Sequence, residues 1–429
     1  MKLVRTFGRG KARADEMIRS LEQRGALNTS TVEKTVTVIV TDVRKRGDAA
    51  LRKYAEKFDG LAEGADLLVS RDEMKAAWEA TAPELRAAMR TAQTNIRAFA
   101  EAQKPKEWSI APAAGVTEGQ ATVGQMVRPL ESVGSYVPGG RYPLPSTLLM
   151  TVTPAQVAGV ERIVVCSPKP ARETLAAAWL AGVTEFYRVG GAQAIATMAY
   201  GTGSGKDGSI ARVNKIVGPG NLFVTAAKML VSAECAIDMP AGPTEIVVTS
   251  ERGDAAGIAA DLVAQAEHDP ETLAVMITSN AALAEAVKAE VKAQAKQNAI
   301  AKVSIAARGC IFVTQSVAEA CELTNRLAPE HLTVDAKTDL KWVKNAGSVF
   351  VGNYSPQSMG DYISGPNHVL PTGRAGRVRG GLSVMDFVKV ITVQEYTRKG
   401  LRALGPHAIA LAEAEGLKGH AESVRVRMR

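Results

Sequence analysis

The alternation of helical stretches with short β-branched runs constrains the fold of this chain more than any other feature. From Ser146 onward, helical segments alternate with runs such as Ile163 to Val165 and Phe186 to Val189. Such alternation is typical of a parallel sheet whose strands are joined by crossover helices. A chain of 429 residues is too long for one ordinary core. The sequence therefore predicts an α/β protein with two Rossmann-like domains.

Turn-rich segments near residues 125 and 240 are the expected domain boundaries, and they place one domain inside the other. We expect an N-terminal helical extension, a first α/β domain in two parts, an inserted α/β domain and a C-terminal tail. In that order the ranges are 1–28, 29–125 with 243–389, 126–242, and 390–429. The tail is too short for a core of its own, so we expect it to pack on the other subunit of a dimer.

The composition argues against several classes of protein. The net charge is +8, but the basic residues are spread thinly and aromatic residues make up only 5%, so we expect no nucleic-acid binding. No apolar run is long enough to span a bilayer, and Met1 to Arg13 lacks the apolar centre of a secretory signal, which predicts a cytoplasmic protein without a membrane partner. The four cysteines have no paired short spacing and lie in or beside apolar runs, so they are expected to be buried free thiols.

An acid and an imidazole stand side by side at Glu330 and His331. Pro329 ends the preceding helical run because proline lacks an N–H donor, so both residues are expected in a loop or at the start of a strand. Adjacent residues of an extended chain point to opposite sides, which would place one group on each side of a reacting centre. Alone, such a pair is more often a capped helix end with solvated side chains, and its interpretation depends on the other motifs.

Three glycine-containing loops follow expected strands: Tyr136 with Gly139-Gly140, Gly190 to Gln193, and Gly218 to Asn221. Backbone N–H groups and helix N-termini at such turns favour anions. Turn chemistry explains any one of them, but three in one domain favour a cofactor crevice. Gly203 to Gly208 has the spelling G-x-G-x-x-G, yet it follows a helix instead of a strand, so we interpret it as a surface loop.

A second polar group lies at the end of an expected helix. Gln265 and His268 are three residues apart, so they share a helix face and can converge on one ion. Asp361, in a loop next to Gly360, can add a carboxylate. Alone, this arrangement is more often a polar helix end than a metal site.

Seven separated motifs, in order along nearly the whole chain, resemble those of the histidinol dehydrogenase family. They are Tyr136 to Gly140, Gly190 to Ala194, Gly218 to Asn221, Asp238 to Pro243, Gln265 to His268, Ala328 to Leu332, and Gly365 to Thr372. The resemblance implies a zinc-dependent, NAD-linked enzyme with one zinc ion per subunit. Its expected reaction is the oxidation of L-histidinol to L-histidine through L-histidinal, the final steps of histidine biosynthesis. It also implies a homodimer in which the tail of one subunit completes the active site of the other.

The resemblance further assigns roles to single residues. Glu330 and His331 match the acid–base pair. The positions that match NAD contacts are Tyr136, Gln193 and Asn221, and those that match zinc ligands are Gln265, His268, Asp361 and, from the tail of the partner subunit, His420. The positions that match substrate contacts are Thr244, Gln265, His268, Glu330, His331, Asp361, Glu415 and His420. Thr244 departs from the serine usual in the family but keeps the hydroxyl.

Acid–base chemistry suggests how the pair would divide the reaction. A neutral imidazole with a pKa of about 6.5 can take a hydroxyl proton at neutral pH, so His331 is the expected base. Glu330 is expected to activate the water that adds to the aldehyde, and zinc to orient the substrate. One alternative is a related NAD-dependent dehydrogenase of another small polar alcohol, against which Glu415 and His420 argue. A non-catalytic nucleotide-binding scaffold is another, and the intact acid–base pair argues against it.

Overall fold

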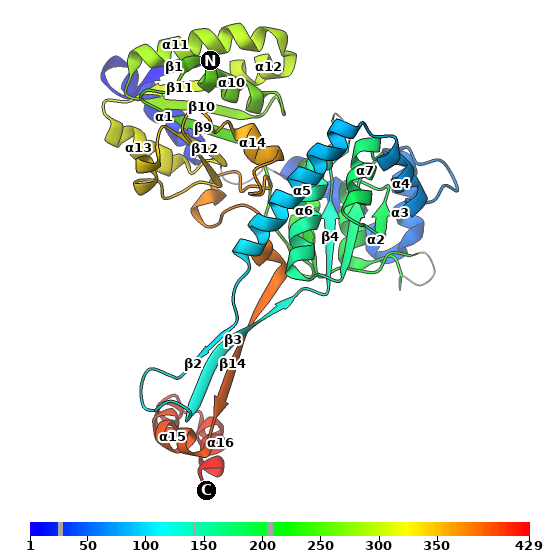
Figure 1. Ribbon diagram of the computed structural model, residues 1–429, viewed down its shortest axis with the longest axis vertical. Helices are drawn as coiled ribbons and strands as arrows, with labels where there is room; N and C mark the ends of the chain where they lie inside the picture. The colour runs from blue at the N-terminus through cyan, green and yellow to red at the C-terminus, as the bar shows by residue number, and fades with distance from the viewer. Residues whose placement is uncertain (25–28, 140–141, 204–208) are drawn as a thin grey trace.

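The computed structural model of the protein describes residues 1–24, 29–139, 142–203 and 209–429. Its strands form a six-stranded sheet and a five-stranded sheet, both parallel, and a three-stranded antiparallel sheet. Helices cover the two parallel sheets, and a long arm projects away from them (Figure 1). This architecture confirms the expected α/β fold with parallel sheets and crossover helices.

The six-stranded sheet carries the residues that the sequence assigned to acid–base chemistry. In spatial order its strands are β1 (Lys2–Arg5), β11 (Cys310–Val313), β10 (Leu273–Thr278), β9 (Glu245–Thr249), β12 (His331–Val334) and β13 (Ser348–Val351). One face packs on α10 (Ala255–Ala266), α11 (Ala281–Gln294) and α12 (Ala299–Arg308), and the other on α1 (Lys11–Glu22) and α13 (Val317–Leu327). Because helices cover both faces, every residue of β9 and β10 is buried.

The N-terminal segment differs from the helical extension expected for 1–28. Residues Lys2–Arg5 form β1, an edge strand that pairs in parallel with β11. Leu3 and Val4 form an apolar run of only two residues between charged neighbours, which is too short to indicate a strand, and pairing with β11 supplies the backbone partners that make the segment one.

The five-stranded sheet carries the glycine loops. In spatial order its strands are β6 (Glu185–Tyr187), β5 (Arg162–Cys166), β4 (Ser132–Tyr136), β7 (Lys215–Val217) and β8 (Ala236–Ile237). Its crossover helices are α6 (Pro145–Ala158), α7 (Arg172–Leu180), α8 (Gly191–Tyr200) and α9 (Leu222–Val231). The carboxyl ends of parallel strands meet at one edge of a sheet, so the loops that follow β4, β6 and β7 lie together there.

The helices between residues 30 and 103 pack on the five-stranded sheet. They are α2 (Ser30–Arg46), α3 (Asp48–Tyr54), a π-helical turn (Ala55–Asp59), α4 (Arg71–Glu79) and α5 (Pro83–Gln103). Val36 and Val43 of α2 share a core with Ile195 and Val224, and Ile96 of α5 packs in the core on the opposite face. This packing groups the segment with residues 132–237, whereas the sequence grouped 29–125 with 243–389. An amphipathic helix reveals that it has a buried face, but not which sheet covers it. The exact domain boundaries stay a prediction.

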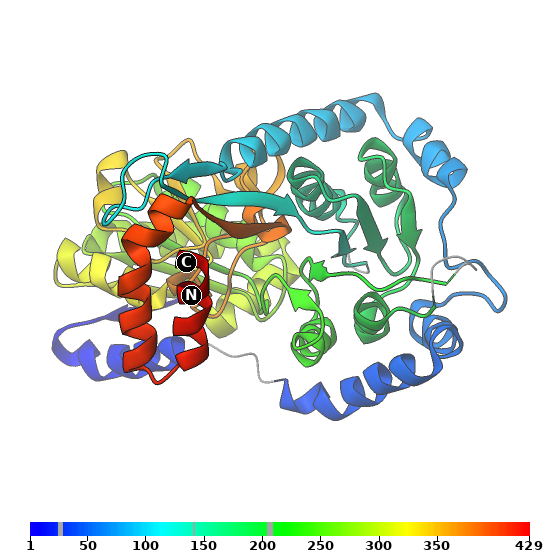
Figure 2. The ribbon, with the colours of Figure 1, turned by 90° about the horizontal axis from the view of Figure 1, so that it is seen from below.

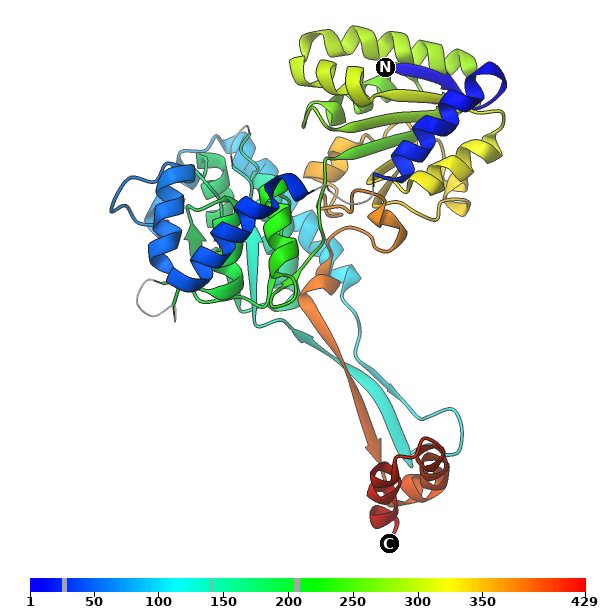
Figure 3. The same cartoon turned by 180° about the vertical axis from the view of Figure 1, so that it is seen from behind.

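The arm combines the three-stranded sheet with the C-terminal helices. It consists of β2 (Trp108–Ile110), β3 (Ala121–Pro129), β14 (Val388–Tyr396), α15 (Arg398–Ala414) and α16 (Lys418–Met428). Eight of the nine residues of β14 are exposed, including Ile391 and Val393. Figure 2 shows α15 and α16 side by side, and Figure 3 shows the arm projecting below both parallel sheets. That the tail packs on a partner subunit stays a prediction.

The remaining elements are short. They are α14 (Gln357–Tyr362) and 3-10 turns at Gly8–Gly10, Ala295–Gln297, Lys337–Lys341, Ala375–Arg377 and Val384–Phe387. All four cysteines are free thiols, as expected; three of them are also buried as expected, whereas Cys321 is only partly buried. Among the described residues, no helix combines the length and the apolar character that a bilayer crossing requires.

Candidate active site

The Glu330 and His331 pair lies where two neighbouring strands begin. Helix α13 ends at Leu327, the capping residue Ala328 adopts a left-handed conformation with φ of 45°, and Pro329 prevents continuation of the helix. His331 is the first residue of β12 and lies opposite Ile246 of β9. The pair therefore stands at the amino ends of the strands, beside the start of β9.

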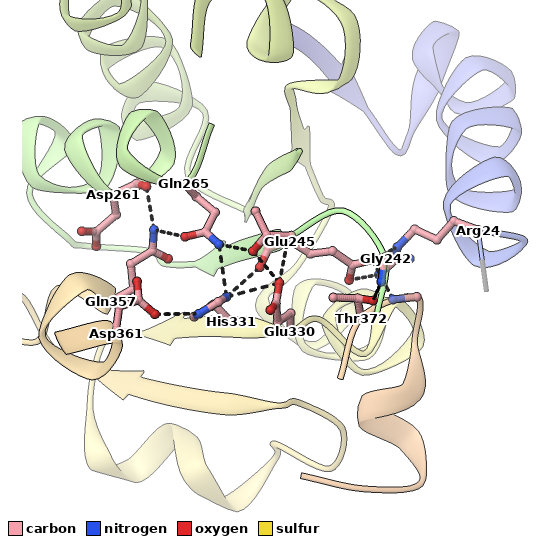
Figure 4. Close-up of polar contacts among 12 residues, drawn as sticks. Arg24, Gly242, Glu245, Asp261, Gln265, Glu330, His331, Gln357, Asp361 and Thr372 are labelled. Atoms are coloured by element: carbon pink, nitrogen blue, oxygen red, sulfur yellow. Dashed lines mark hydrogen bonds and ion pairs between the residues drawn. The ribbon is translucent and has the colours of Figure 1, made fainter. Parts of the chain in front are cut away.

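The two side chains of the pair converge (Figure 4). Glu330 Oε2 lies 3.6 Å from His331 Nδ1, and the two residues are only 6% and 2% exposed. The expectation that they point to opposite sides is wrong, because Glu330 lies in a bend before β12 and not in extended chain. Both groups can therefore act on one reacting centre from the same side.

Glu330 is held by the start of β9. Its Oε2 accepts hydrogen bonds from the Thr244 hydroxyl at 2.6 Å and from the Glu245 N–H at 2.7 Å. Both donors suit an ionised carboxylate. The hydroxyl at position 244 therefore contacts the acid of the pair directly.

The surroundings of His331 distinguish its two ring nitrogens. Nδ1 lies 3.1 Å from the Glu245 carbonyl oxygen, which can only accept, so we assign the hydrogen to Nδ1. Nε2 lies 3.4 Å from Asp361 Oδ1. Nε2 is thus the nitrogen that is positioned to exchange a proton with a ligand.

Two carboxylates control the charge of the His331 ring. Burial opposes a positive charge there, but Glu330 and then Asp361 outweigh it and raise the pKa of His331 to about 10. Burial likewise opposes a charge on Asp361, yet the hydrogen bond from His331 lowers the pKa of this carboxyl below its usual value. The protein alone favours the protonated ring, which differs from the neutral imidazole expected from the sequence.

The expected metal ligands Gln265 and Asp361 flank His331. Gln265, near the end of α10, donates from Nε2 to the Thr244 hydroxyl and accepts at Oε1 from Gln357 Nε2 at 2.8 Å. His268 is exposed just beyond α10, and its charge acts on the carboxyl of Asp361. A carbonyl oxygen, an imidazole nitrogen and a carboxylate oxygen are donors that Zn²⁺ accepts, so this set is chemically compatible with zinc.

The tail residues lie elsewhere in the same chain. Glu415 follows α15 and His420 belongs to α16, at the far end of the arm (Figures 1 and 3). Within the described residues, no group of three or more His, Cys, Asp or Glu side chains is arranged to hold a metal ion. One subunit therefore brings together Gln265, Asp361 and the acid–base pair, but not the two tail residues.

The three expected cofactor residues line one cavity of about 490 Å³. Tyr136 ends β4, Gln193 lies in the first turn of α8, and Asn221 caps α9. The Tyr136 hydroxyl accepts from the Gly191 N–H at 3.1 Å, and the Asn221 Oδ1 accepts from Phe223 N and Val224 N. Two helix N-termini thus point at the cavity, as an anionic cofactor requires. Their role in binding NAD stays a prediction.

Sequence reasoning missed two residues that support these sites. Asp59, from the π-helical turn, is buried and accepts from Gly190 N and Gln193 Nε2, each at 3.0 Å, while burial raises the pKa of its carboxyl. Gln357 is 1% exposed and binds both Gln265 and the Asp261 carbonyl. Neither belongs to a motif, because each acts on a partner more than ninety residues away.

The context of the remaining glycine-rich sequence is given by the elements on either side of it. Residues 204–208 and Gly140 lie outside the described residues. The G-x-G-x-x-G spelling stands between α8, which ends at Tyr200, and β7, which starts at Lys215. The strand-then-helix context of a dinucleotide fingerprint is therefore missing.

Comparison with known proteins gives a consistent result. Residues 22–428 match the family model described as histidinol dehydrogenase. The chain is 46% identical to the histidinol dehydrogenase of Methanosarcina barkeri over 408 residues, which cover 92% of each protein. It is 44% identical to that of Bacillus thuringiensis over 421 residues, or 96% of each. The crystal structure of histidinol dehydrogenase from Elizabethkingia anophelis superposes with a TM-score of 0.91 at 34% identity, covering 100% of this chain and 98% of that one.

Proposed function

The chain belongs to the histidinol dehydrogenase family, and from this premise we propose that it oxidises L-histidinol to L-histidine through L-histidinal, with NAD accepting the hydrides. The observation that carries the proposal is the convergence of Glu330 and His331 beside Gln265 and Asp361. Family membership makes the protein an oxidoreductase. The cofactors and the separate steps are part of the proposal.

We propose that His331 Nε2 accepts the proton that the substrate hydroxyl loses. The Glu245 carbonyl holds Nδ1 and fixes the orientation of the ring, so only Nε2 can face a ligand. Zinc, held by Gln265, His268, Asp361 and a tail residue of the partner subunit, would orient the substrate and neutralise the carboxylate of Asp361. The negative charge beside His331 would then be smaller, which would lower the pKa of the ring and allow it to act as a base near neutral pH.

Glu330 is our candidate for the second half of the reaction. Thr244 and the Glu245 N–H both bind Oε2, so Oε1 is the oxygen that we assign to the water that adds to the aldehyde. Glu330 Oε2 lies 3.6 Å from His331 Nδ1, which is too far for a direct hydrogen bond, so the carboxylate acts on the ring through its charge while both groups face the same reacting centre. The aldehyde would therefore be hydrated at the place where it is formed.

The cavity at Tyr136, Gln193 and Asn221 is our candidate NAD site. Asn221 uses its side-chain carbonyl to cap α9, so its Nδ2 is the group that can donate to the cofactor. Gly191 has a φ of 61°, and a Cβ there would lie 2.9 Å from the Gln193 amide oxygen, so a side chain would disturb this turn. The donors and the two helix N-termini suit a pyrophosphate.

We infer a homodimer with composite active sites. Glu415 and His420 are distant from the other proposed site residues of their own chain, and both the strand β14 and the helices of the arm have exposed apolar residues, such as Ile391 and Leu411. A segment of this kind commonly packs on another subunit. The substrate contacts expected from Glu415 and His420 would then come from the partner.

Production of NADH from L-histidinol tests the function directly, with about two NADH per substrate as the expected stoichiometry for a four-electron oxidation. Glu330→Gln should impair oxidation of supplied L-histidinal more than the first step, because only the aldehyde needs activated water. His331→Asn should impair the first step as well, and Glu322→Gln, on the exposed side of α13, serves as the matched control. Stopped-flow traces measure both steps. Turnover of another amino alcohol, but not of L-histidinol, would favour the related dehydrogenase instead.

A further inference from the structure

Lys228 and Asp238 form a buried ion pair at Gly218, where the turn that leads to Asn221 of the candidate cofactor cavity begins. Their side chains are only 2% and 0% exposed, and Lys228 is among the largest fully buried side chains of the protein. A lysine is rarely buried to this degree unless it is paired, and an apolar pair of similar volume would often be equally stable. The pair therefore calls for an explanation other than stability.

Both charges act on the backbone of one residue, Gly218. Lys228 Nζ donates to the Gly218 carbonyl at 3.0 Å and also contacts Asp238 Oδ1. The Gly218 N–H donates to Asp238 Oδ2 at 2.8 Å, and the Met239 N–H donates to Oδ1 at 2.6 Å. The ammonium and the carboxylate thus hold the acceptor and the donor of the same residue.

Gly218 begins the turn Gly218 to Asn221, and the last residue of this turn lines the cavity. Gly218 has a φ of 111°, which favours glycine, and a Cβ there would lie 2.1 Å from the Tyr136 carbonyl oxygen. Three residues later, Asn221 caps α9 and lines the cavity together with Tyr136. Lys228 lies on that same helix, so the ion pair ties the start of the turn to the helix that the turn begins.

Asp238 also joins the turn to the segment that enters the acid–base site. Its carbonyl accepts from the Arg379 guanidinium, which forms two 3.0 Å bonds to Asp386. The connection to Thr244, Pro240 to Pro243, begins two residues beyond Asp238. Movement of Gly218 would therefore be resisted both by its bond to Lys228 on α9 and by its bond to Asp238, which precedes this connection.

We propose that Lys228 and Asp238 are positioning residues that hold the Gly218 to Asn221 turn in its cofactor-binding conformation before the cofactor arrives. The inference rests on the proposed function, in which this cavity binds NAD. Preorganisation of this kind lowers the cost of binding, because the turn need not be ordered by the ligand. Neither residue contacts the ligand itself, so their effect passes through Gly218 and Asn221.

The test compares Lys228→Met with the double variant Lys228→Met, Asp238→Asn, which leaves no buried charge unpaired. Equilibrium titration with NAD alone should give a dissociation constant at least about tenfold higher for both variants, since bonds to charged groups are lost. KM for NAD should rise while kcat at saturating NAD changes little. The matched control is Arg162→Met, Glu185→Gln, an ion pair at the amino ends of β5 and β6 in the same sheet. It should leave NAD affinity within about twofold.

Hydrogen exchange of the wild-type protein gives a second measurement that needs no variant. The amide of Gly218 should exchange slowly even without NAD, because its partner Asp238 is in place. Fast exchange that slows only when NAD binds would overturn the inference. Folded variants that bind NAD as tightly as the wild type would also overturn it. The same holds for variants whose affinities for NAD and for L-histidinol fall by the same factor. A wild-type protein that binds no NAD would overturn the proposed function and this inference with it.

Discussion

Replacing Thr244 by valine tests whether the hydroxyl at this position serves the acid of the pair. Valine has nearly the same shape as threonine, so the change opens no cavity, but it removes both bonds of the hydroxyl: the 2.6 Å bond that it donates to Glu330 and the bond that it accepts from Gln265 Nε2. A hydrogen bond to a charged group contributes about 1.5–3 kcal/mol, and Glu330 is only 6% exposed, so water cannot readily replace the donor. One bond, from the Glu245 N–H, would remain.

If the bond persists in the transition state, its loss lowers kcat/KM by about ten- to hundredfold, since about 1.4 kcal/mol corresponds to a factor of ten. The loss should be larger with L-histidinal than with L-histidinol, because our mechanism uses Glu330 to activate water. Steady-state kinetics with each substrate measures it, and thermal unfolding checks that both variants fold. Thr244→Ser keeps the hydroxyl and should retain activity within about threefold. Equal activity of the valine and serine variants would refute the role of the hydroxyl.

Three further predictions follow from particular residues. Burial alone raises the pKa of Asp261 to about 6, so ionisation of this carboxyl destabilises the folded protein above about pH 6 and has no such effect below about pH 4. Asp261→Asn should therefore raise the free energy of unfolding by about 1–2 kcal/mol at pH 8 and by almost nothing at pH 4. A stability difference that does not depend on pH would contradict this prediction. Purified protein should contain about one zinc per subunit by elemental analysis and lose turnover after chelation, whereas full activity without metal would contradict the zinc assignment. Mixing inactive His420→Ala and His268→Ala subunits should restore about a quarter of wild-type activity, because about half of the dimers would be heterodimers and each heterodimer would have one intact site. No recovery of activity in proven heterodimers would exclude a composite site.

The grouping of Tyr136, Gln193 and Asn221 around one cavity was the feature most open to prediction from sequence. Tyr136 ends β4, Gln193 lies in the first turn of the helix after β6, and Asn221 caps the helix after β7, yet all three strands belong to one parallel sheet. The carboxyl ends of such strands meet at one edge, so the fold class alone brings the turns together. Asp59 escaped this reasoning because it reaches the cavity from a helical segment packed on the sheet from outside, and only tertiary structure brings it beside Gln193.

The sequence identified Glu330 and His331 as a candidate acid–base pair, which stays a prediction, but it did not reveal their geometry or the charge of the ring. The convergence of Glu330 and His331 depends on the left-handed residue Ala328 and the bend that follows, and alanine gives no signal for that conformation. The high pKa of His331 arises from two carboxylates, one of them thirty residues away in Asp361. Local sequence identifies the groups, whereas long-range contacts set their protonation.

The register of two strands explains how both groups of the pair are held together. Glu245 donates its N–H to Glu330 and offers its carbonyl to His331 Nδ1, so the backbone of one residue orients both side chains. No side-chain motif reveals such a role, because any residue carries these backbone groups. The contact requires that β9 and β12 start side by side, and a slip of one residue would break both bonds. The Glu245 carboxylate opposes that slip, since it is tied to Arg24 by two 2.9 Å bonds and to the Gly373 N–H by one of 3.0 Å.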